Sequence, residues 1–443
     1  MLSQDTIFAL SSGRPPAGVA VFRMSGPMVR FGLETLIGYV PADRRLVVAN
    51  IANPVSAEVI DRGLAVFFPG PASFTGEDAA ELHIHGGRAV VAALTEALGQ
   101  IDGFRLATPG EFARRAFERG KLDLAAVEGL ADLVAAETEM QRRQALRQAG
   151  GALGSLCEAW RHKLIRARAM IEAELDFSEE EDVPRGIAAE AFRQIAGVRE
   201  GIAAALRDDR RGERLRDGLE VVILGAPNAG KSSLLNALAR REAAIVSAEP
   251  GTTRDLIEVR MDLDGFPLTL IDTAGIRCAE SAVEREGVQR AKARAALADV
   301  SIVLTDASVA GSQFDFKPSG AFLRVATKID LLDSDPEQLT RNGQFEYAIS
   351  VVTGAGIDGL VASLARLAAE QLDAAEPAIV TRQRHRFALT DCLGALDRTE
   401  KQADLEVVAE ELRTASDALA RIVGRIDVED WLDVIFSEFC IGK

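Results

Sequence analysis

A segment that can bind phosphate lies near the middle of the chain, at Gly225-Ala-Pro-Asn-Ala-Gly-Lys-Ser232. It fits the pattern G-x-x-x-x-G-K-[ST], in which glycines let the backbone wrap around phosphate oxygens and backbone N–H groups face the anion. Lys231 can reach the β- and γ-phosphates of a nucleotide, and the Ser232 hydroxyl can ligate Mg²⁺. The apolar run Leu219–Leu224 precedes this segment, and the helical pattern Ser233–Leu238 follows it. We therefore predict a strand, a phosphate-binding loop and a helix that together hold a nucleotide and magnesium.

Segments further along the chain distinguish this site from a glycine-rich turn that arose by chance. Asp272-Thr-Ala-Gly275 ends an apolar strand, which places a carboxylate near the magnesium and a glycine amide near the γ-phosphate. Gly251-Thr-Thr-Arg-Asp255 is a candidate switch loop, because Thr253 can close on the magnesium when the γ-phosphate is present. Ser350 ends the strand predicted at 345–349, where a loop along the base edge is expected.

Thr327-Lys-Ile-Asp330 follows the predicted strand 322–326 and predicts which base is bound. The Asp330 carboxylate can accept two N–H donors of guanine, and adenine lacks that pair, so we predict GTP rather than ATP. These elements occur in the order found in the translation-factor-like GTPases, which the segment resembles. Most of those proteins begin this segment with Asn. Because Thr327 keeps a hydroxyl but lacks an amide N–H, we expect somewhat weaker guanine affinity, with specificity kept by Asp330.

Length and composition restrict the class of protein. The chain has 443 residues, enough for two to four domains that each bury a core. Its net charge of −16 argues against a general nucleic-acid coat, although a local basic patch for one folded RNA stays possible. No apolar run reaches the ~18 residues of a membrane span, and no secretory signal begins the sequence. The four cysteines are far apart, which suits a reducing cytosol and gives no zinc pattern; we expect a cytoplasmic protein that does not contact membranes.

Three polar residues alternate with apolar ones in a predicted strand of the N-terminal region. Glu81, His83 and His85 flank Leu82 and Ile84, so on a strand their side chains share one face. An acidic residue and two histidines could bind a metal, but no further ligand group with suitable spacing is visible. A polar ligand pocket is the favoured interpretation, and a solvated strand face is the remaining one.

The distribution of apolar runs, glycines and prolines along the sequence predicts an α/β plus all-α fold. An α/β domain spans 1–118, helices span 119–217, the nucleotide domain spans 218–372, and helices return at 373–443. We expect one helix over Leu122–Gln148 and a charged, solvated linker at 207–217 without a function. Neither helical part can bury its apolar stripes alone, so we predict that the two pack as one helical domain. The Ras-like P-loop GTPase domain is then an insertion into that bundle.

The Asp264-Gly265 pair is a strong hairpin signal within the nucleotide domain. It predicts one antiparallel strand at the edge of an otherwise parallel sheet.

Several specific motifs make the whole chain resemble one known family, the bacterial tRNA-modification GTPases called MnmE or TrmE. The resemblance covers nearly all residues and rests on the nucleotide-domain motifs above and on four others. These are Thr75–Gly87, Ala107–Phe112 with Arg115-Ala-Phe117, Gly120–Leu124, and the terminal Phe439-Cys-Ile-Gly-Lys443.

This resemblance implies an N-terminal domain similar to folate-binding one-carbon transferases, which forms homodimers and binds a tetrahydrofolate derivative of the 5-formyl or methylene type. By motif position the folate contacts are Arg23, Glu81, Lys121 and Lys443. It also implies an FAD-dependent partner, MnmG, in a heterotetramer. Together the two proteins add an aminomethyl or carboxymethylaminomethyl group to the five position of the wobble uridine of certain tRNAs. The family's tail motif contains Cys440.

The resemblance further implies how GTP is hydrolysed. Ras-type enzymes orient water with a Gln after the D-x-x-G motif, but Ile276 stands there in this chain. Related GTPases use a potassium ion instead, held by the loop asparagine, here Asn228. The potassium site is completed by a loop over the nucleotide when two GTPase domains meet, and the water-positioning acid matches Glu284. Glu249-Pro250 replaces the usual aliphatic–Ala pair, which alters the stiffness of that loop.

Motif position thus assigns the following roles. The catalytic residues are Glu284, Lys231 and Asn228; magnesium contacts Ser232 and Thr253; and potassium contacts Asn228, Ser247, Glu249 and Thr252. The GTP contacts are Asn228, Ala229, Gly230, Lys231, Ser232, Ser233, Ser247, Ala248, Glu249, Pro250, Gly251, Thr252, Thr253, Asp272, Thr273, Ala274, Gly275, Thr327, Lys328, Asp330 and Ser350.

Two other functions fit parts of the sequence. A GTP-regulated ribosome or RNA assembly factor would explain the GTPase domain but not the folate-like domain and the Cys-Ile-Gly-Lys tail. A metabolic aminomethyltransferase would leave the inserted GTPase domain unexplained. The tRNA-modifying GTPase accounts for all of these features.

Overall fold

A computed structural model describes most of the chain as two compact units. The residues described are 5–176, 187–208, 210–241, 243–245, 257–272, 296–309, 320–332, 335–373, 378–426, 432, 435–437, 439 and 442. The first unit comprises Met1–Ala131, Gln148–Ile195 and Gly394–Lys443, and the second comprises Asp132–Arg147 and Ala196–Leu393. Among the described helices, none is long and apolar enough to cross a membrane.

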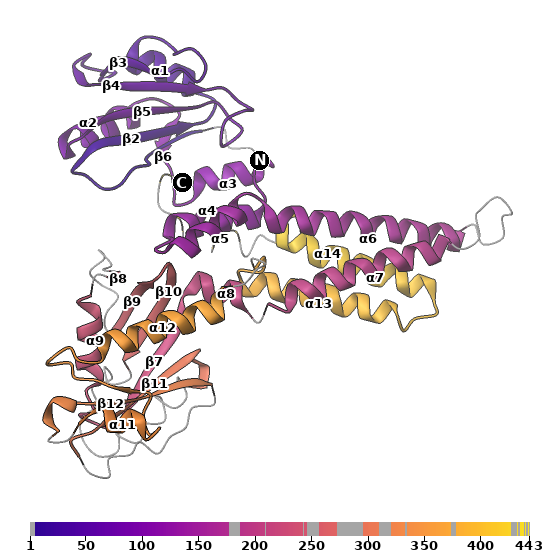
Figure 1. Cartoon of the computed structure of the whole chain (residues 1–443). Coiled ribbons are helices and arrows are strands. Elements are labelled where there is room, and N and C mark those ends of the chain that lie inside the picture. The colour runs from indigo at the N-terminus through magenta and orange to yellow at the C-terminus, as the bar shows by residue number, and fades with distance from the viewer. Residues whose placement is uncertain are drawn as a thin grey trace, which may run out of the picture. The chain divides into compact units, whose positions relative to one another are not determined.

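A six-stranded sheet forms the N-terminal part of the first unit (Figure 1). The strand order is β3-β4-β5-β2-β1-β6, antiparallel at every pairing except β1 with β6. The strands are β1 (Thr6–Leu10), β2 (Ala17–Ser25), β3 (Val47–Ala52), β4 (Val59–Phe68), β5 (Ala79–Gly86) and β6 (Phe104–Leu106). Helices α1 (Val29–Ile37) and α2 (Arg88–Gly99) bury their leucines in a core shared with one face of this sheet.

The alternation of β5 separates that core from a polar face. Ala80, Leu82 and Ile84 are buried in the core under the helices. Glu81 and His83 are half-buried and His85 is exposed, as expected for side chains on the opposite face of a strand. The strand pattern therefore positions all three polar residues on the face that α1 and α2 do not cover.

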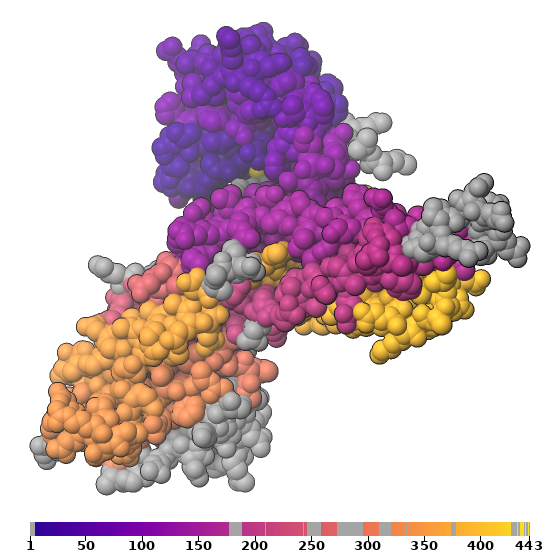
Figure 2. Space-filling model, turned by 45° about the vertical axis from the view of Figure 1, so that its right-hand side comes forward, coloured from indigo at the N-terminus to yellow at the C-terminus, as the bar shows by residue number. Residues whose placement is uncertain are grey.

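Helices from distant parts of the sequence pack together in the first unit. Helix α6 (Ala152–Asp176) lies along α14 (Leu405–Val423), as Figure 1 and the magenta and yellow residues of Figure 2 show. The nucleotide domain separates these two helices in sequence. Helix α14 buries leucines and alanines along one side and begins at Asp404, whose carboxylate accepts the Glu406 N–H. Helix α3 (Glu111–Glu118) follows β6.

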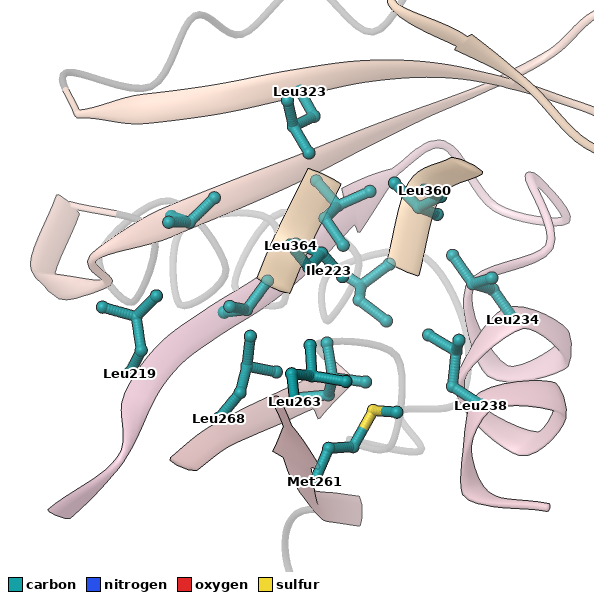
Figure 3. Close-up of a cluster of buried hydrophobic side chains, with 14 of the residues drawn as sticks. Leu219, Ile223, Leu234, Leu238, Met261, Leu263, Leu268, Leu323, Leu360 and Leu364 are labelled. Atoms are coloured by element: carbon teal, nitrogen blue, oxygen red, sulfur yellow. The ribbon is translucent and has the colours of Figure 1, made fainter. Parts of the chain in front are cut away.

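A seven-stranded sheet forms the core of the second unit, in the order β13-β12-β11-β7-β10-β9-β8. The strands are β7 (Leu219–Gly225), β8 (Ala244–Ile245), β9 (Ile257–Leu263), β10 (Phe266–Asp272), β11 (Val300–Asp306), β12 (Ala321–Thr327) and β13 (Tyr347–Ala348). The strands from β13 to β10 are parallel. Figure 3 shows the apolar core between this sheet and helices α9 (Lys231–Ala239) and α12 (Ile357–Leu372), with Ile223, Leu234 and Leu360 among its members.

The hairpin signal at Asp264-Gly265 is confirmed, because both residues have positive φ and join antiparallel β9 and β10. The prediction that a single antiparallel strand forms the edge is wrong. The short strand β8 pairs with β9 beyond it. The last parallel strand, Tyr347–Ala348, is shorter than the predicted 345–349, although the N–H groups of Glu346 and Ile349 also donate to β12 carbonyls at 2.9 and 2.8 Å.

The single helix predicted over Leu122–Gln148 is wrong, because two helices occupy that stretch. Helix α4 (Leu124–Ala135) ends, and α5 (Glu139–Ala149) begins after Thr138. The Gln141 side chain accepts the N–H groups of Glu137 and Thr138, and the Thr138 hydroxyl lies 3.4 Å from the Gln141 amide nitrogen. This T-x-x-Q capping box starts a new helix within the stretch that was predicted as one helix.

The charged segment 207–217 is likewise not a solvated linker. It contains helix α8 (Arg211–Asp217), which buries Leu215 and Glu213. The Glu213 carboxylate accepts hydrogen bonds from Arg210 and Arg386, each at 2.7 Å. A distant arginine thus explains how this charge run can be partly buried. The remaining helical elements are α7 (Ile187–Leu206), η1 (Ile329–Leu331), α11 (Glu337–Arg341) and α13 (Gln383–Thr399).

Candidate functional site

The phosphate-binding loop connects the end of β7 to the start of α9. Gly225 has φ +155°, and a Cβ there would lie 2.7 Å from the Leu304 carbonyl oxygen, so only glycine fits beside β11. Asn228 (φ +63°) and Gly230 (φ +95°) are also in left-handed conformations, which curl the loop over the helix N-terminus. Lys231 Nζ donates to the carbonyls of Gly225 and Ala226 at 2.8 and 2.9 Å. Burial lowers the pKa of Lys231, although nearby Asp272 opposes that effect.

Two oxygen ligands suited to magnesium meet at the ends of β10 and α9. Asp272 is fully buried at the last position of β10, which runs parallel to β7. The Ser232 hydroxyl donates to Asp272 Oδ2 at 2.6 Å. Magnesium prefers such hard oxygen donors and commonly binds through one or two protein groups and phosphates. The pair therefore has the donor chemistry that a magnesium ion beside the phosphate loop would need, and the magnesium assignment stays a prediction.

The predicted base-binding residues follow β12 and β13 at the same edge of the sheet. Lys328 has φ +58°, and its Nζ donates to Asp306 Oδ2 at 2.6 Å. Asp330 is exposed and, within the described part of the chain, its carboxylate has no hydrogen-bond partner. Ser350 is buried, and the Ile329 N–H donates to the Ile349 carbonyl at 3.4 Å, which joins the two loops. Because parallel strands end at one edge, these loops lie on the side of the sheet that carries the phosphate loop.

Several predicted site residues lie outside the described residues, so their assignments stay predictions. They are Ser247, Ala248, Glu249, Pro250, Gly251, Thr252, Thr253, Thr273, Ala274, Gly275, Glu284 and Lys443; the same holds for Ile276 and Cys440.

A second candidate site lies on the polar face of the N-terminal sheet. Arg23 on β2 pairs with Glu81 on β5, and its Nε and Nη2 donate to Glu81 Oε1 at 3.1 and 2.9 Å. The guanidinium also lies 5.7 Å from the centroid of the Phe74 ring and 5.9 Å from that of Phe112. His83 Nε2 lies 3.2 Å from the other Glu81 oxygen. Two rings and a carboxylate therefore hold one cation in place at a partly exposed position.

Of the other predicted folate residues, Lys121 is described and contacts a loop that reaches this face. Lys121 Nζ donates to the Pro71 carbonyl at 3.0 Å, on the loop that carries Phe74. The Ser11 hydroxyl, just after β1, donates to the carbonyl of Gly442 at 2.9 Å. Gly442 itself has φ +103° and packs against Leu10 and Ser11, so the residue before Lys443 lies against the strand next to β2.

His83 and His85 have separate carboxylate partners. His85 Nδ1 lies 2.9 Å from Asp61 Oδ1, and the His85 backbone N–H donates to Asp61 Oδ2. Over the described ranges, no group of three or more potential ligands could hold a metal ion. The arrangement thus suits a polar pocket better than a metal centre.

A buried ion-pair network lies behind this polar face, and the sequence analysis did not predict it. Arg115 on α3 is 4% exposed and contacts Glu77, Glu111 and Asp5 at 3.1, 3.1 and 2.8 Å. Glu77 also accepts the Ser25 hydroxyl at 2.9 Å. The one local signal is that Glu111 and Arg115 are four residues apart and so share a helix face.

The network has a marked electrostatic effect on Glu111. Burial alone would raise the pKa of Glu111, but hydrogen bonds from Arg105, the Thr108 amide and Arg115 lower it to about 2. Glu111 is therefore ionised at neutral pH. It helps fix α3, and with it Phe112, against the Arg23 guanidinium.

Comparisons with known proteins agree across the chain. The family model described as GTP-binding protein TrmE N-terminus matches residues 6–121, and the MnmE helical domain model matches residues 124–440. A protein of Parvibaculum lavamentivorans named tRNA modification GTPase MnmE is 55% identical, covering 99% of this chain and all of the relative. A Brucella anthropi protein of the same name is 50% identical over 99% of this chain and 98% of its own. The solved G domain of the T. maritima FeoB iron transporter is 23% identical and covers 35% of this chain and 99% of its own, with a TM-score of 0.25, too low to support an inference.

Proposed function

This chain belongs to the MnmE family of tRNA modification GTPases, and we propose that it is a potassium-dependent member that modifies wobble uridine. It hydrolyses GTP and takes part in tRNA modification, as the family does. We further propose that it acts as a homodimer with the FAD-dependent partner MnmG. The two proteins would form a heterotetramer that adds an aminomethyl or carboxymethylaminomethyl group at the five position of the wobble uridine.

The observation that carries this proposal is the presence of two different sites in one chain. The phosphate loop, where the Ser232 hydroxyl donates to Asp272, would hold magnesium and a nucleotide. The polar face, where Arg23 donates to Glu81, would hold an organic ligand. A simple GTPase needs only the first site and a simple one-carbon transferase only the second. Relatives of 50–55% identity cover 99% of the chain, so the similarity extends over both regions.

The residues of the nucleotide site divide the tasks of hydrolysis. Lys231 neutralises phosphate charge, and Ser232 and Asp272 would hold Mg²⁺, which stabilises charge on the phosphates. Asn228 is exposed, and within the described residues its amide has no hydrogen-bond partner, so its oxygen is available to a cation. We propose that Asn228 holds potassium together with Ser247, Glu249 and Thr252. Glu284 would orient the attacking water, a task that Ile276 cannot perform.

The polar face suits a tetrahydrofolate derivative. A folate carries carboxylates that cations can bind and a pterin whose N–H groups a carboxylate can accept. We propose that Arg23, Lys121 and Lys443 contact the folate and that Glu81 accepts from the pterin. Arg23 already has two rings and one carboxylate around it, so it is held in place before a ligand arrives. When bound, the folate would supply the one-carbon unit.

The proposal is tested by the nucleosides of tRNA. In a strain that lacks the gene, mass spectrometry should show wobble uridine without the five-position group, and wild-type protein should restore it. Lys231→Ala and Glu81→Ala should each fail to restore it, because one removes a nucleotide contact and the other a folate contact. Glu58→Ala, an exposed position in the same N-terminal region, is the matched control and should restore it fully. Normal wobble uridine in the deletion strain would refute the proposed reaction.

A further inference from the structure

Thr327 joins the base-binding segment to the phosphate loop. It is the last residue of β12 and only 2% exposed. Its hydroxyl donates to the Ala229 carbonyl oxygen at 2.8 Å, and the Thr305 carbonyl lies farther away at 3.2 Å. Ala229 belongs to the phosphate loop and is 1% exposed, so this carbonyl is shielded from water. The phosphate loop and the base-binding segment are thus connected by one hydroxyl group.

Packing places the Thr327 side chain directly beneath the phosphate loop. A Cβ built on Gly230 would lie 4.0 Å from Thr327 Cβ, which is ordinary van der Waals contact. A hydroxyl has one hydrogen to donate, and here the Ala229 carbonyl receives it. The Thr327 hydroxyl therefore donates its one hydrogen to the phosphate loop and cannot donate to a base.

The next residue is held by a different contact. Lys328 Nζ donates to Asp306 Oδ2, while Asp306 Oδ1 accepts the amide and hydroxyl of Ser308. Burial works to raise the pKa of Asp306, but these hydrogen bonds and the charge of Lys328 lower it overall. Lys328 is thus fixed to the end of β11. Of the three polar side chains from 327 to 330, only that of Asp330 is exposed and without a partner in the described part of the chain.

We propose that Thr327 is a positioning residue that aligns the phosphate loop with the base-binding segment and does not read the base. Base selectivity then rests on Asp330. This inference depends on the proposed assignment of Asp330 to guanine. It predicts that removal of the hydroxyl weakens all purine nucleotides equally, because the phosphate loop loses its alignment whichever base is bound.

The test compares GDP with IDP by isothermal titration calorimetry on the full chain. Hypoxanthine lacks the exocyclic amine of guanine, so the GDP-to-IDP affinity ratio reports the contact with Asp330. Thr327→Val keeps the shape but removes the hydroxyl, which leaves the buried Ala229 carbonyl unpaired. We expect both nucleotides to bind roughly five- to fifty-fold more weakly, with an unchanged ratio. Thr327→Ser keeps the hydroxyl and should bind both within about two-fold of wild type.

Two results would overturn the proposal. A changed GDP-to-IDP ratio in Thr327→Val would mean that the hydroxyl reads the base. Unchanged affinity for both nucleotides, even with a lowered melting temperature, would mean that Thr327 is only structural. If Thr327→Val does not fold, Thr327→Ala replaces it in the comparison with Thr327→Ser.

The Asp330→Asn variant tests the assignment of Asp330 to guanine separately from the proposed role of Thr327. That variant should lose the preference for GDP over IDP. An unchanged ratio in Asp330→Asn would refute the base site, while the absolute affinities of the Thr327 variants would still decide whether the hydroxyl aligns the loop.

Discussion

Replacement of Arg115 by Met should destabilise the first unit far more than the same change at its neighbour Arg114. Arg115 is buried and contacts three carboxylates, two of which belong to the nearly buried Glu77 and Glu111. Removal of one partner from a buried ion pair typically costs about 3–5 kcal/mol. Glu77 keeps Arg119 and Glu111 keeps Arg105, so we expect the lower end, about 3 kcal/mol.

Arg114→Met is the matched control on the same helix. Arg114 is 41% exposed and pairs with Glu118, which is 43% exposed, at 3.2 Å. It also lies 6.0 Å from the centroid of the Phe436 ring. An exposed ion pair and an exposed cation–π contact each contribute up to about 1 kcal/mol, and often less, so the control should lose about 1 kcal/mol and at most about 2 kcal/mol.

The loss should depend on pH in a defined direction. The pKa of Glu111 falls from 4.5 in the unfolded chain to about 2 in the folded one. Its contribution to stability is therefore fully present above pH 4.5 and is lost as the pH falls toward 2. The shift corresponds to at most about 3 kcal/mol, and screening at half-exposed Arg105 reduces this to roughly 1–2 kcal/mol. The difference between wild type and Arg115→Met should accordingly shrink below pH 4.5, as the carboxylates take up protons.

Urea unfolding followed by tryptophan fluorescence would measure this difference, because the buried Trp160 lies in helix α6 of the first unit. Urea titrations of the full-length wild type, Arg115→Met and Arg114→Met are compared at pH 7 and at pH 3.5. Equal midpoints for Arg115→Met and Arg114→Met at pH 7 would refute the reasoning. So would a difference that stays constant or grows at the lower pH.

Four further predictions concern the two sites. Glu81→Ala should abolish folate binding in calorimetry, while Glu58→Ala should leave it intact. Unchanged folate affinity in Glu81→Ala would show that the folate site does not include Glu81. Asp330→Asn should weaken GTP and favour xanthosine triphosphate, because the amide presents a donor to the xanthine carbonyl; equal GTP affinity would remove Asp330 from the base site. GTP turnover should be faster in potassium than in sodium at matched ionic strength and should rise with protein concentration, and Asn228→Ala should lose the potassium stimulation yet still bind nucleotide; equal rates in both salts would contradict this. Glu284→Ala should bind GTP normally but hydrolyse it slowly, and a wild-type rate would assign the water to another group.

The features that the sequence predicted well are local ones. The strand Thr6–Leu10 and the loop from Gly225 to Ser232 follow from apolar runs and glycines within a few positions of each other. The same holds for the Asp264-Gly265 turn, whose positive φ angles suit those residue types. The T-x-x-Q cap at Thr138 was equally local, but no glycine or proline marks the break between α4 and α5 in the sequence.

The features that only the tertiary structure decided depend on residues far apart in the chain. Asp5 and Arg115 meet although 110 positions separate them, and Thr327 reaches Ala229 across 98. Whether a charged side chain is buried depends on such partners, because an ion leaves water only where another group compensates it. The sequence alone therefore determined the chemistry that each segment offers, through residue type and short-range spacing. The fold decided which of those groups are buried together, because burial and pairing are properties of the packed chain.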